Sequence, residues 1–504
     1  MTASTAPRAL SSRLPWTHPL FWFAAISLAH VAMRLLASPA LKWDEAEQIL
    51  WTQELALGYG PQPPLYTWLQ WAMNQVFGPS VLALSLLKHG LLALTYSLMY
   101  LAGRELLDER GAFWASASMV LMPALGWHSV RDQTHTILVT AMACGAWWLL
   151  LRIVRRPRQS DFAWLGAACA VGMLSKYSFA LVAGAMLAAA LSVPKARRAL
   201  LARGWWWALI VGVLLVLPHG LWLLSHLHDA TAGTLSKMEI RAHHLGSGLY
   251  ELLDGLVGTL LLWALVALWA FGRGWWRKPL VPAAPWAQQV FVRYLALVLL
   301  ALLGMVLFAG VTNFKGRWII PLLCVLPLAA FAARPELQAD ARGGRRYLGA
   351  VLTMALLALV MAGLRPWVSS LRGGTDELNQ PAYALAGQLR AHGYDGRSPI
   401  IASDHMLAGT LRLRFPRAPV MACHPSVTDV PTCVRNAVAA AKQQGQGWLL
   451  ISRSDRLEPG WWALARAAIG ARPAQSIELP FRKVPASTPP AHYDFIWQAP
   501  KAGS

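Results

Sequence analysis

The chain has 504 residues, of which 56% are hydrophobic and only 14% are charged. An ordinary soluble domain carries about a quarter charged residues, so this composition excludes a purely soluble protein. The net charge of +21 would suit a nucleic-acid-binding protein, but Lys and Arg fall in short clusters between apolar stretches rather than on one amphipathic face. We therefore expect a membrane protein with no nucleic-acid partner.

Apolar stretches of about 17 to 25 residues, each long enough to cross a hydrocarbon core, recur along the first three quarters of the chain. A polar segment, residues 1–19, precedes the first stretch, which ends without a small-residue cleavage site, so we expect a retained helix rather than a signal peptide. The sequence predicts about eleven transmembrane helices. Their expected positions are 18–37, 81–102, 111–128, 132–151, 162–175, 177–194, 204–224, 250–271, 290–310, 318–333 and 347–365.

The basic residues indicate how the chain crosses the membrane. They gather in alternate loops, near Arg104 and in segments 152–158, 195–203, 273–278 and 334–346, while the intervening loops hold fewer. By the positive-inside rule, this asymmetry predicts a multi-pass protein of the inner (cytoplasmic) membrane with a cytoplasmic N-terminus. An odd number of helices then places the C-terminal part outside the cytoplasm.

The character of the chain changes after residue 365. Residues 1–365 are predicted to form the transmembrane domain and residues 366–504 a separate soluble α/β domain outside the cytoplasm, of ordinary domain size. Alternating patterns predict five strands and three amphipathic helices. The strands are expected at 399–404, 418–422, 447–453, 475–479 and 493–498, and the helices at 377–391, 431–443 and 460–469. We expect a binding or capping role for this domain.

The chain has five cysteines, too few for a disulfide scaffold. Cys144, Cys169 and Cys324 lie in apolar stretches, where packing is the expected role. Cys423 and Cys433 lie in a polar context, and their spacing fits a disulfide in an oxidising compartment; a free pair fits the sequence equally well.

The loop after the first predicted helix, residues 38–80, is too polar to cross the membrane and too rich in Trp, Tyr and Leu to be free in water. Amphipathic rings favour headgroup depth, and residues 45–57 can form a helix lying on the surface. We therefore expect the loop to follow the outer interface. Its aromatic residues include Trp43, Trp51, Tyr59, Tyr66, Trp68 and Trp71.

Asp44 and Glu45 open this loop. Carboxylates are common in the first turn of a helix, so a capping role is the simpler interpretation. A functional role gains weight because other outer loops also carry ionisable groups, which near hydrocarbon usually line a water-filled cavity or pair with one another. These groups are Arg131, Asp132, His135, Lys176, Lys315 and Arg317.

Five segments, in this order, carry a resemblance to a known family. They are Trp43-Asp44-Glu45-Ala46, Gly58-Tyr59-Gly60-Pro61-Gln62-Pro63-Pro64-Leu65-Tyr66, Arg131-Asp132-Gln133-Thr134-His135, Leu174-Ser175-Lys176-Tyr177, and Arg317-Trp318 with Pro321. Over most of its length the chain resembles the bacterial relatives of dolichyl-phosphate-mannose protein mannosyltransferases, which include the aminoarabinose transferase that modifies lipid A. The resemblance implies a polytopic all-α GT-C fold with an acidic residue of the first outer loop above a cavity for a polyprenyl-phosphate sugar.

The resemblance also implies roles for individual residues. Asp44 is the expected general base and Glu45 the fallback. Asp132 could orient the acceptor, share a cation with Asp44 or simply pair with Arg131. Lys176, Arg317 and Lys315 would offset the charge of the donor phosphate, although basic residues at helix ends also snorkel to headgroups. Residues expected to position donor or acceptor are Tyr59, Gln62, Tyr66, Arg131, His135 and Tyr177, with helix packing as the simpler role for His135.

No cofactor is required by this chemistry. Asp44 and Asp132 could hold Mg²⁺ or Mn²⁺, but the sequence contains no dedicated ligand cluster. It also lacks a glycine-rich phosphate loop, which favours a lipid-linked donor over a nucleotide sugar.

The sequence therefore predicts an integral membrane glycosyltransferase that moves a sugar from a polyprenyl-phosphate donor to an extracytoplasmic acceptor. A glycolipid such as lipid A or lipopolysaccharide is the favoured acceptor, and a polymer or a protein hydroxyl would suit the same mechanism. Two alternatives belong to other classes. A transporter or lipid flippase would also carry charged groups in its helices, but should show internal repeats. A membrane scaffold with an outer binding domain would leave the loop chemistry unused.

Overall fold

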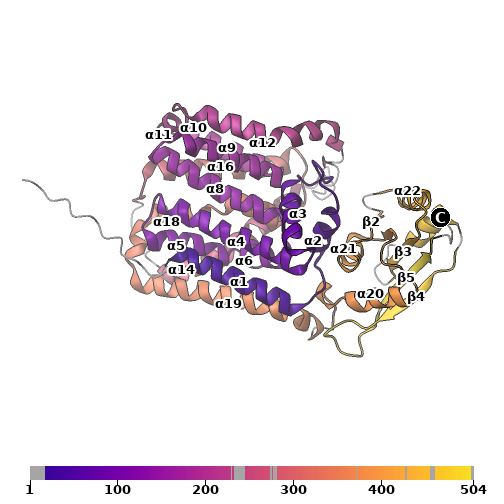
Figure 1. Ribbon diagram of the computed structural model, residues 1–504. Coiled ribbons are helices and arrows are strands. Elements are labelled where there is room, and N and C mark those ends of the chain that lie inside the picture. The colour runs from indigo at the N-terminus through magenta and orange to yellow at the C-terminus, as the bar shows by residue number, and fades with distance from the viewer. Residues whose placement is uncertain are drawn as a thin grey trace, which may run out of the picture.

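The structure, a computed structural model, describes residues 18–228, 230–231, 245–272, 275, 281–371, 373–425, 428–454, 460–470 and 472–500. Four residues of one loop lie outside these ranges: Lys237 and Arg241, which are among the fewer basic residues of the intervening loops, and His243 and His244, for which the sequence predicts no role. The described residues form a membrane part, α1 to α19, and an α/β part, η4 to β5 (Figure 1).

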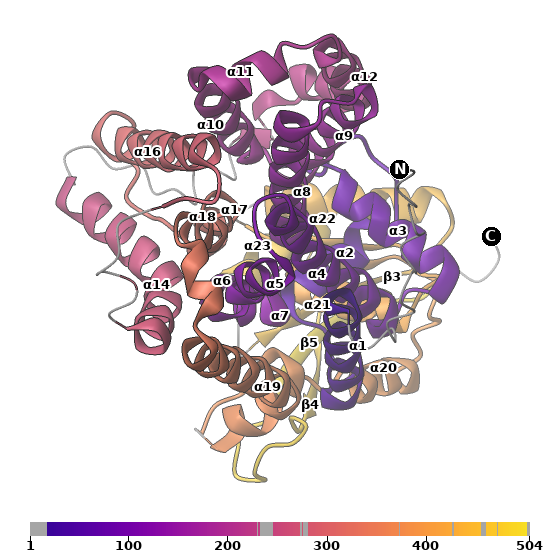
Figure 2. The same ribbon diagram turned by 90° about the vertical axis from the view of Figure 1, so that its left-hand side faces the viewer.

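The membrane part is a bundle of long apolar helices, seen end-on in Figure 2. Among the described residues, eight helices are long and apolar enough to cross a membrane, or nine if a bent pair is counted as one span. The eight are α1 (Pro19–Ala37), α4 (Val81–Arg104), α8 (His135–Arg155), α12 (Trp205–Ser225), α14 (Leu245–Phe271), α16 (Pro285–Leu307), α17 with α18 (Gly316–Leu323 and Leu326–Ala333) and α19 (Ala341–Leu371). The bent pair is α10 (Phe179–Ser192) with α11 (Pro194–Leu200), and the chain bends by 113° between these two helices.

The polytopic helical fold is thus confirmed, with fewer spans than the eleven predicted. The segment predicted at 111–128 is broken into α5 (Glu109–Ala117), η2 (Ser118–Leu121), α6 (Pro123–Gly126) and α7 (His128–Asp132). Met122 is extended because the residue before a proline avoids the helical region, and Pro123 then begins a new helix. The segment predicted at 162–175 is α9 (Gln159–Ser175), whose 17 residues are at the lower limit of length for a span, and it is not among the eight.

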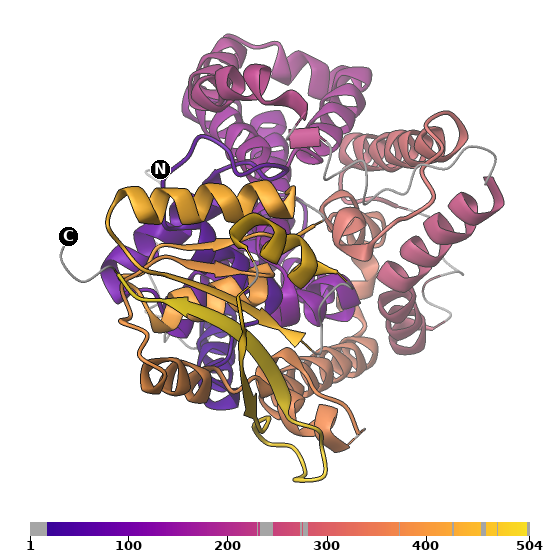
Figure 3. The same cartoon turned by 90° about the vertical axis from the view of Figure 1, so that its right-hand side faces the viewer.

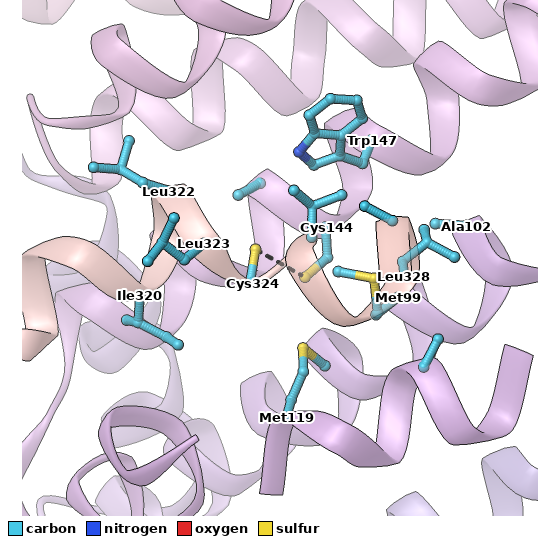
Figure 4. Close-up of a cluster of buried hydrophobic side chains, with 14 of the residues drawn as sticks. Met99, Ala102, Met119, Cys144, Trp147, Ile320, Leu322, Leu323, Cys324 and Leu328 are labelled. Atoms are coloured by element: carbon cyan, nitrogen blue, oxygen red, sulfur yellow. Dashed lines mark hydrogen bonds between the residues drawn. The ribbon is translucent and has the colours of Figure 1, made fainter. Parts of the chain in front are cut away.

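Aliphatic side chains pack with cysteines, methionines and one tryptophan in a buried hydrophobic cluster of the membrane part (Figure 4). Cys144 of α8 and Cys324, at the end of α17, are fully buried with their sulfur atoms 3.9 Å apart. Met99, Met119 and Trp147 belong to the same buried cluster. Cys144 and Cys324 therefore have the packing role that their apolar surroundings predict.

Two shorter helices, α2 (Trp43–Trp51) and α3 (Leu65–Phe77), lie across the end of the bundle that faces the α/β part (Figure 1). The helix expected at 45–57 is shorter than predicted. The reason is that Tyr59 holds the following residues in a loop: its hydroxyl donates a hydrogen bond to the Glu54 carbonyl (2.7 Å) and accepts one from the Ala56 N–H (3.0 Å).

The α/β part is a five-stranded sheet of order β2-β1-β3-β5-β4 with helices on both faces (Figure 3). β1 (Ile400–Ala402) pairs in parallel with β2 (Val420–Ala422) and β3 (Trp448–Arg453), and β5 (Ala491–Gln498) runs antiparallel to β3 and β4 (Gln475–Leu479). All five strands lie where the sequence predicts them. One face packs against α20 (Ala382–Ala391) and α21 (His405–Arg414), the other against α22 (Val430–Gln443) and α23 (Trp461–Ile469).

The α21 helix was not expected from the sequence, and it joins the two parts. It packs on α2, so that Leu50 of α2 belongs to the same buried cluster as Leu407 and Leu411 of α21. α19 runs through the predicted boundary at 365–366 and ends at Leu371; the short helix η4 (Glu377–Asn379) follows before α20. The α/β part therefore rests directly on the loop that carries the acidic motif.

Candidate active site

A cavity of about 500 Å³, called here the main cavity, lies where α2, the start of α8, the α9–α10 connection and α17 meet. Its volume is in the range of small-molecule sites. Asp44, Lys176 and Arg317 lie in its wall, so the fold brings together the three residues on which the predicted chemistry depends. The polar and aromatic part of the wall also includes Trp43, Glu47, Gln62, Gln133, His135, Thr136, Tyr177 and Trp318.

Asp44 lies in the first turn of α2 and is partly exposed. Removal of water by the surrounding protein raises the pKa of this carboxyl group to about 6, although the positive charges of Arg317 and Lys88 act in the opposite direction. A carboxylate with this pKa can both hold and release a proton near neutral pH.

Glu45, the fallback base, has a different environment. Arg34 of α1 donates two hydrogen bonds to it, from Nε to Oε1 (3.0 Å) and from Nη2 to Oε2 (2.6 Å), and the Lys42 backbone N–H also donates to Oε2 (3.0 Å). Both partners of this ion pair are buried, and the positive charges hold the pKa of Glu45 far below its usual range. Glu45 is not in the wall of the main cavity; its role here is to fix α2 on α1.

Asp132, at the end of α7, is held by two arginines. Arg131 donates to one carboxylate oxygen, which is the simpler pairing expected from the sequence, and Arg365 donates to the other (3.0 Å). Arg365 also binds Asp376 (2.7 Å) and Glu377 (3.4 Å). Asp132 is therefore part of a charged junction between the membrane part and the start of the α/β part, and neither it nor Arg131 lines the main cavity.

This arrangement does not fit a metal ion shared by Asp44 and Asp132. Such an ion would have to displace Arg131 or Arg365 from Asp132. Within the described ranges, no group of three or more His, Cys, Asp or Glu side chains is placed to hold a metal. We therefore derive no catalytic step through a metal.

Two of the three predicted phosphate-binding cations face the main cavity. Lys176 follows the last turn of α9, and its ammonium group donates to Thr136 Oγ1 (3.1 Å), while Arg317 lies in the first turn of α17. Lys315, which precedes α17, is exposed and lies outside the cavity wall.

The predicted positioning residues of the first loop divide into two groups. Gln62 lines the main cavity, and its backbone pairs with that of Tyr59 in a tight turn whose Gly60 has a φ of +57°, a conformation that glycine adopts without strain. Tyr59 stacks on Trp51, with ring centroids 5.7 Å apart, and shapes the loop instead of lining the cavity. Tyr66 is fully buried beside His135, with ring centroids 5.2 Å apart.

His135 and Tyr177 both lie in the wall. His135 is within hydrogen-bonding distance of Gln48 Nε2 (3.3 Å), and Tyr177 is paired through its hydroxyl with His219 Nε2 (3.2 Å). The helix-packing role expected for His135 is thus combined with a position at the cavity.

Sequence reasoning missed several charged groups behind and beside Asp44. Glu47 lies in the cavity wall one turn after Asp44, and Lys42 and Lys88 are buried nearby. Arg34, the partner of Glu45, was missed as well. Lys88 and Arg34 could have been found from the sequence, because both lie inside apolar stretches, where charged side chains are costly and usually functional.

Comparison with known proteins also indicates a glycosyltransferase. The family model described as dolichyl-phosphate-mannose-protein mannosyltransferase matches residues 61–222. Lipopolysaccharide core galacturonosyltransferase RgtA of Rhizobium johnstonii is 31% identical over 480 residues, which cover 91% of this chain and 93% of RgtA. The chain belongs to the bacterial GT-C glycosyltransferases. RgtB of the same organism, also a lipopolysaccharide core galacturonosyltransferase, is 31% identical over 473 residues with the same coverage.

A solved GT-C structure shares the fold. ArnT from Cupriavidus metallidurans in the apo state superposes with a TM-score of 0.61 at 15% sequence identity, over 94% of this chain and 97% of ArnT. Membership of this GT-C family confirms the membrane glycosyltransferase predicted from the sequence, and it leaves no support for the transporter and scaffold alternatives.

Proposed function

We propose that this GT-C enzyme transfers an acidic sugar, a galacturonosyl unit, from a polyprenyl-phosphate donor to a sugar of lipopolysaccharide core at the outer face of the inner membrane. The observation that carries the proposal is the main cavity, where a carboxylate with a pKa near 6 faces two cations. The identity of the sugar and the acceptor is supported by the relatives RgtA and RgtB, both named lipopolysaccharide core galacturonosyltransferases.

A lipid-linked donor is supported by a solved neighbour. ArnT has also been solved with bound undecaprenyl phosphate, and that structure matches this chain with a TM-score of 0.59 over 94% of its length. A galacturonosyl phosphodiester carries two negative charges, one on the phosphate and one on the sugar carboxylate. Lys176 and Arg317 supply two positive charges in the same wall, Arg317 through a planar fork that suits either anion.

The proposed reaction is a single displacement. The acceptor hydroxyl oxygen attacks the anomeric carbon, Asp44 takes the hydroxyl proton, and the bond from the anomeric carbon to the phosphate oxygen breaks with its electrons on the polyprenyl phosphate. Direct attack inverts the anomeric centre. Lys176 and Arg317 stabilise the phosphate as its charge grows, and a positioned base of this kind typically contributes about 10²- to 10⁴-fold.

The test is transfer by purified protein in lipid nanodiscs. Polyprenyl-phosphate galacturonic acid and lipopolysaccharide core are supplied, and mass spectrometry follows the addition of one hexuronosyl residue. Asp44→Asn should lose at least about 100-fold in rate. Glu54→Gln, which removes an exposed carboxylate from the same loop, should keep the wild-type transfer rate.

Two results would count against the proposal. If Asp44→Asn keeps the wild-type rate while Glu47→Gln loses it, the base is Glu47. If wild type transfers a neutral sugar from its polyprenyl phosphate and not galacturonic acid, the assignment of an acidic donor is wrong.

A further inference from the structure

One polar side chain is buried on a helix at the edge of the membrane part. α12 packs beside α9, and of its 21 residues, all of them described, His219 is the one that is buried (Figure 2). Polar groups on a membrane span are costly and usually face the protein interior, where they often have a function. The contacts of His219 therefore indicate what this residue does.

His219 connects the first outer loop with the wall of the main cavity. Its Nδ1 lies 2.6 Å from the carbonyl oxygen of Leu57, and its Nε2 lies 3.2 Å from the hydroxyl of Tyr177, which lines the cavity. Its ring stacks on those of Tyr177 and Trp222, with centroid distances of 5.8 and 5.6 Å. A β-carbon added at Gly58 would lie 2.2 Å from the Trp222 ring, so the loop also rests on α12. The imidazole is thus held in one orientation.

These contacts decide which group donates each hydrogen bond. A carbonyl oxygen only accepts, so Nδ1 of His219 carries the proton in the contact with Leu57. A buried imidazolium would need a counter-ion, and a neutral imidazole has a single N–H, so Nε2 accepts. The Tyr177 hydroxyl therefore donates its proton to His219. Its oxygen keeps its lone pairs and can take part in a further hydrogen bond only as the acceptor.

We infer that His219 is a positioning residue that fixes the Tyr177 hydroxyl as the acceptor for one hydroxyl group of the donor's sugar ring. An ionised phosphate or carboxylate has no proton to donate, so Tyr177 selects a hydroxyl and not an anionic group. Lys176, which precedes Tyr177 and lies in the same wall, is assigned to the donor phosphate, and this places Tyr177 on the donor side. The inference rests on the proposed function and names a group of the donor that the enzyme recognises.

The test combines variants with altered donors. Full-length protein in nanodiscs receives polyprenyl-phosphate galacturonic acid or the same donor without its hydroxyl at C2, C3 or C4. One deoxy donor should lower kcat/KM of wild type at least about tenfold relative to Tyr177→Phe, because only wild type loses a hydrogen bond with it. Comparing two enzymes on the same donor cancels the intrinsic reactivity of that donor. If each deoxy donor changes kcat/KM by the same factor in both enzymes, the inference is overturned.

Variants of His219 test the positioning role. His219→Leu should raise KM for the complete donor and lose the discrimination against the same deoxy donor. His219→Gln, whose amide can both donate to Leu57 and accept from Tyr177, should restore most of that discrimination. Tyr250→Phe, which removes an exposed hydroxyl from α14, should behave as wild type. If His219→Leu slows the transfer of all donors by one factor, its role is structural and the inference fails.

Kinetics also separate this inference from the proposed function. If wild type transfers galacturonic acid while Tyr177→Phe matches it on every donor, only the inference fails. If wild type transfers a different sugar from polyprenyl phosphate, the proposed sugar is wrong, and deoxy forms of the transferred sugar test Tyr177 in the same way. A rise in the acceptor KM alone for Tyr177→Phe would place the recognised hydroxyl on the acceptor and contradict the assignment to the donor.

Discussion

Gly409 of α21 lies directly against the main chain of Ala46 in α2. A β-carbon added at position 409 would lie 2.3 Å from the Ala46 carbonyl oxygen, which is backbone and cannot turn away. Glycine is thus needed here for close approach of two helices. The contact makes the α/β part a support for the helix that carries Asp44.

Gly409→Ala should therefore push α21 away from α2. Overpacking of this kind costs about 1 to 3 kcal/mol. We expect faster hydrogen exchange in α2 and at least a several-fold slower transfer, measured on the same nanodisc preparation. Gly387→Ala in the neighbouring helix α20 is the control, because nothing lies within 4 Å of a β-carbon added at that position. Equal exchange in α2 for both variants would show that the two helices are not coupled.

The pH dependence of transfer should follow Asp44. The burial of this carboxyl group raises its pKa to about 6, and only the deprotonated form accepts a proton. The value of kcat/KM should therefore fall about tenfold per pH unit below pH 6 and reach a plateau above it. The residual rate of Asp44→Asn should lack this step. A wild-type profile that is flat from pH 5 to 7 would contradict the assignment of the base.

Glu45 should affect stability more than chemistry. Glu45→Gln leaves Arg34 as a buried charge without its counter-ion, a change that typically costs about 3 to 5 kcal/mol. We expect a large fall in the thermal inactivation temperature. The double variant Arg34→Met/Glu45→Met removes both charges and should recover much of this loss. If Glu45→Gln is as stable as wild type but inactive, Glu45 has a chemical role after all.

Lys176 and Arg317 should determine donor binding. Lys176→Met removes a charge from the cavity wall, and Arg317→Lys keeps the charge but loses the planar fork. Each should raise KM for the donor about tenfold, since a hydrogen bond to a charged group is worth roughly 1.5 to 3 kcal/mol. Lys315→Met, outside the wall, should have little effect. A rise in donor KM for Lys315→Met as large as that for Lys176→Met would restore Lys315 to the predicted phosphate site.

The Cys423–Cys433 disulfide provides a test of the predicted membrane orientation, in which the α/β part lies outside the cytoplasm. Cys423 and Cys433 are bonded in the structure, and such bonds persist in oxidising compartments. In intact cells, both thiols should resist a membrane-permeant maleimide until a reductant is added. Removing the bond with Cys423→Ser should cost about 2 to 4 kcal/mol in the α/β part. Prompt labelling before reduction would instead place the α/β part in the cytoplasm.

The sequence predicts much of the fold because its patterns are local. Strands such as 475–479 show alternation over a few residues, and Pro123 marks a break that the length of the apolar run at 111–128 conceals. α21 could not be recognised from periodicity, because it is buried on two sides, by the sheet and by α2. A helix covered on both sides has no apolar stripe that differs from its polar face.

The candidate site can also be predicted only in part, because only some of its residues are marked by local sequence patterns. Asp44, Lys176 and Arg317 could be grouped because each lies at the outer end of a predicted helix. The partners of the neighbouring carboxylates could not, since Arg365 is 233 residues from Asp132 and only the folded chain brings them together. Adjacent acidic residues thus acquire opposite roles: Asp44 faces the cavity while Glu45 is neutralised by Arg34.

The Ala46–Gly409 contact also limits how these enzymes can be recombined. An engineer who wishes to change acceptor choice would naturally graft the soluble tail of one relative onto the membrane helices of another. In this chain such a graft cuts through the packing of α2 on α21, and with it the placement of Asp44. A working chimera should therefore exchange α2 and α21 as one unit.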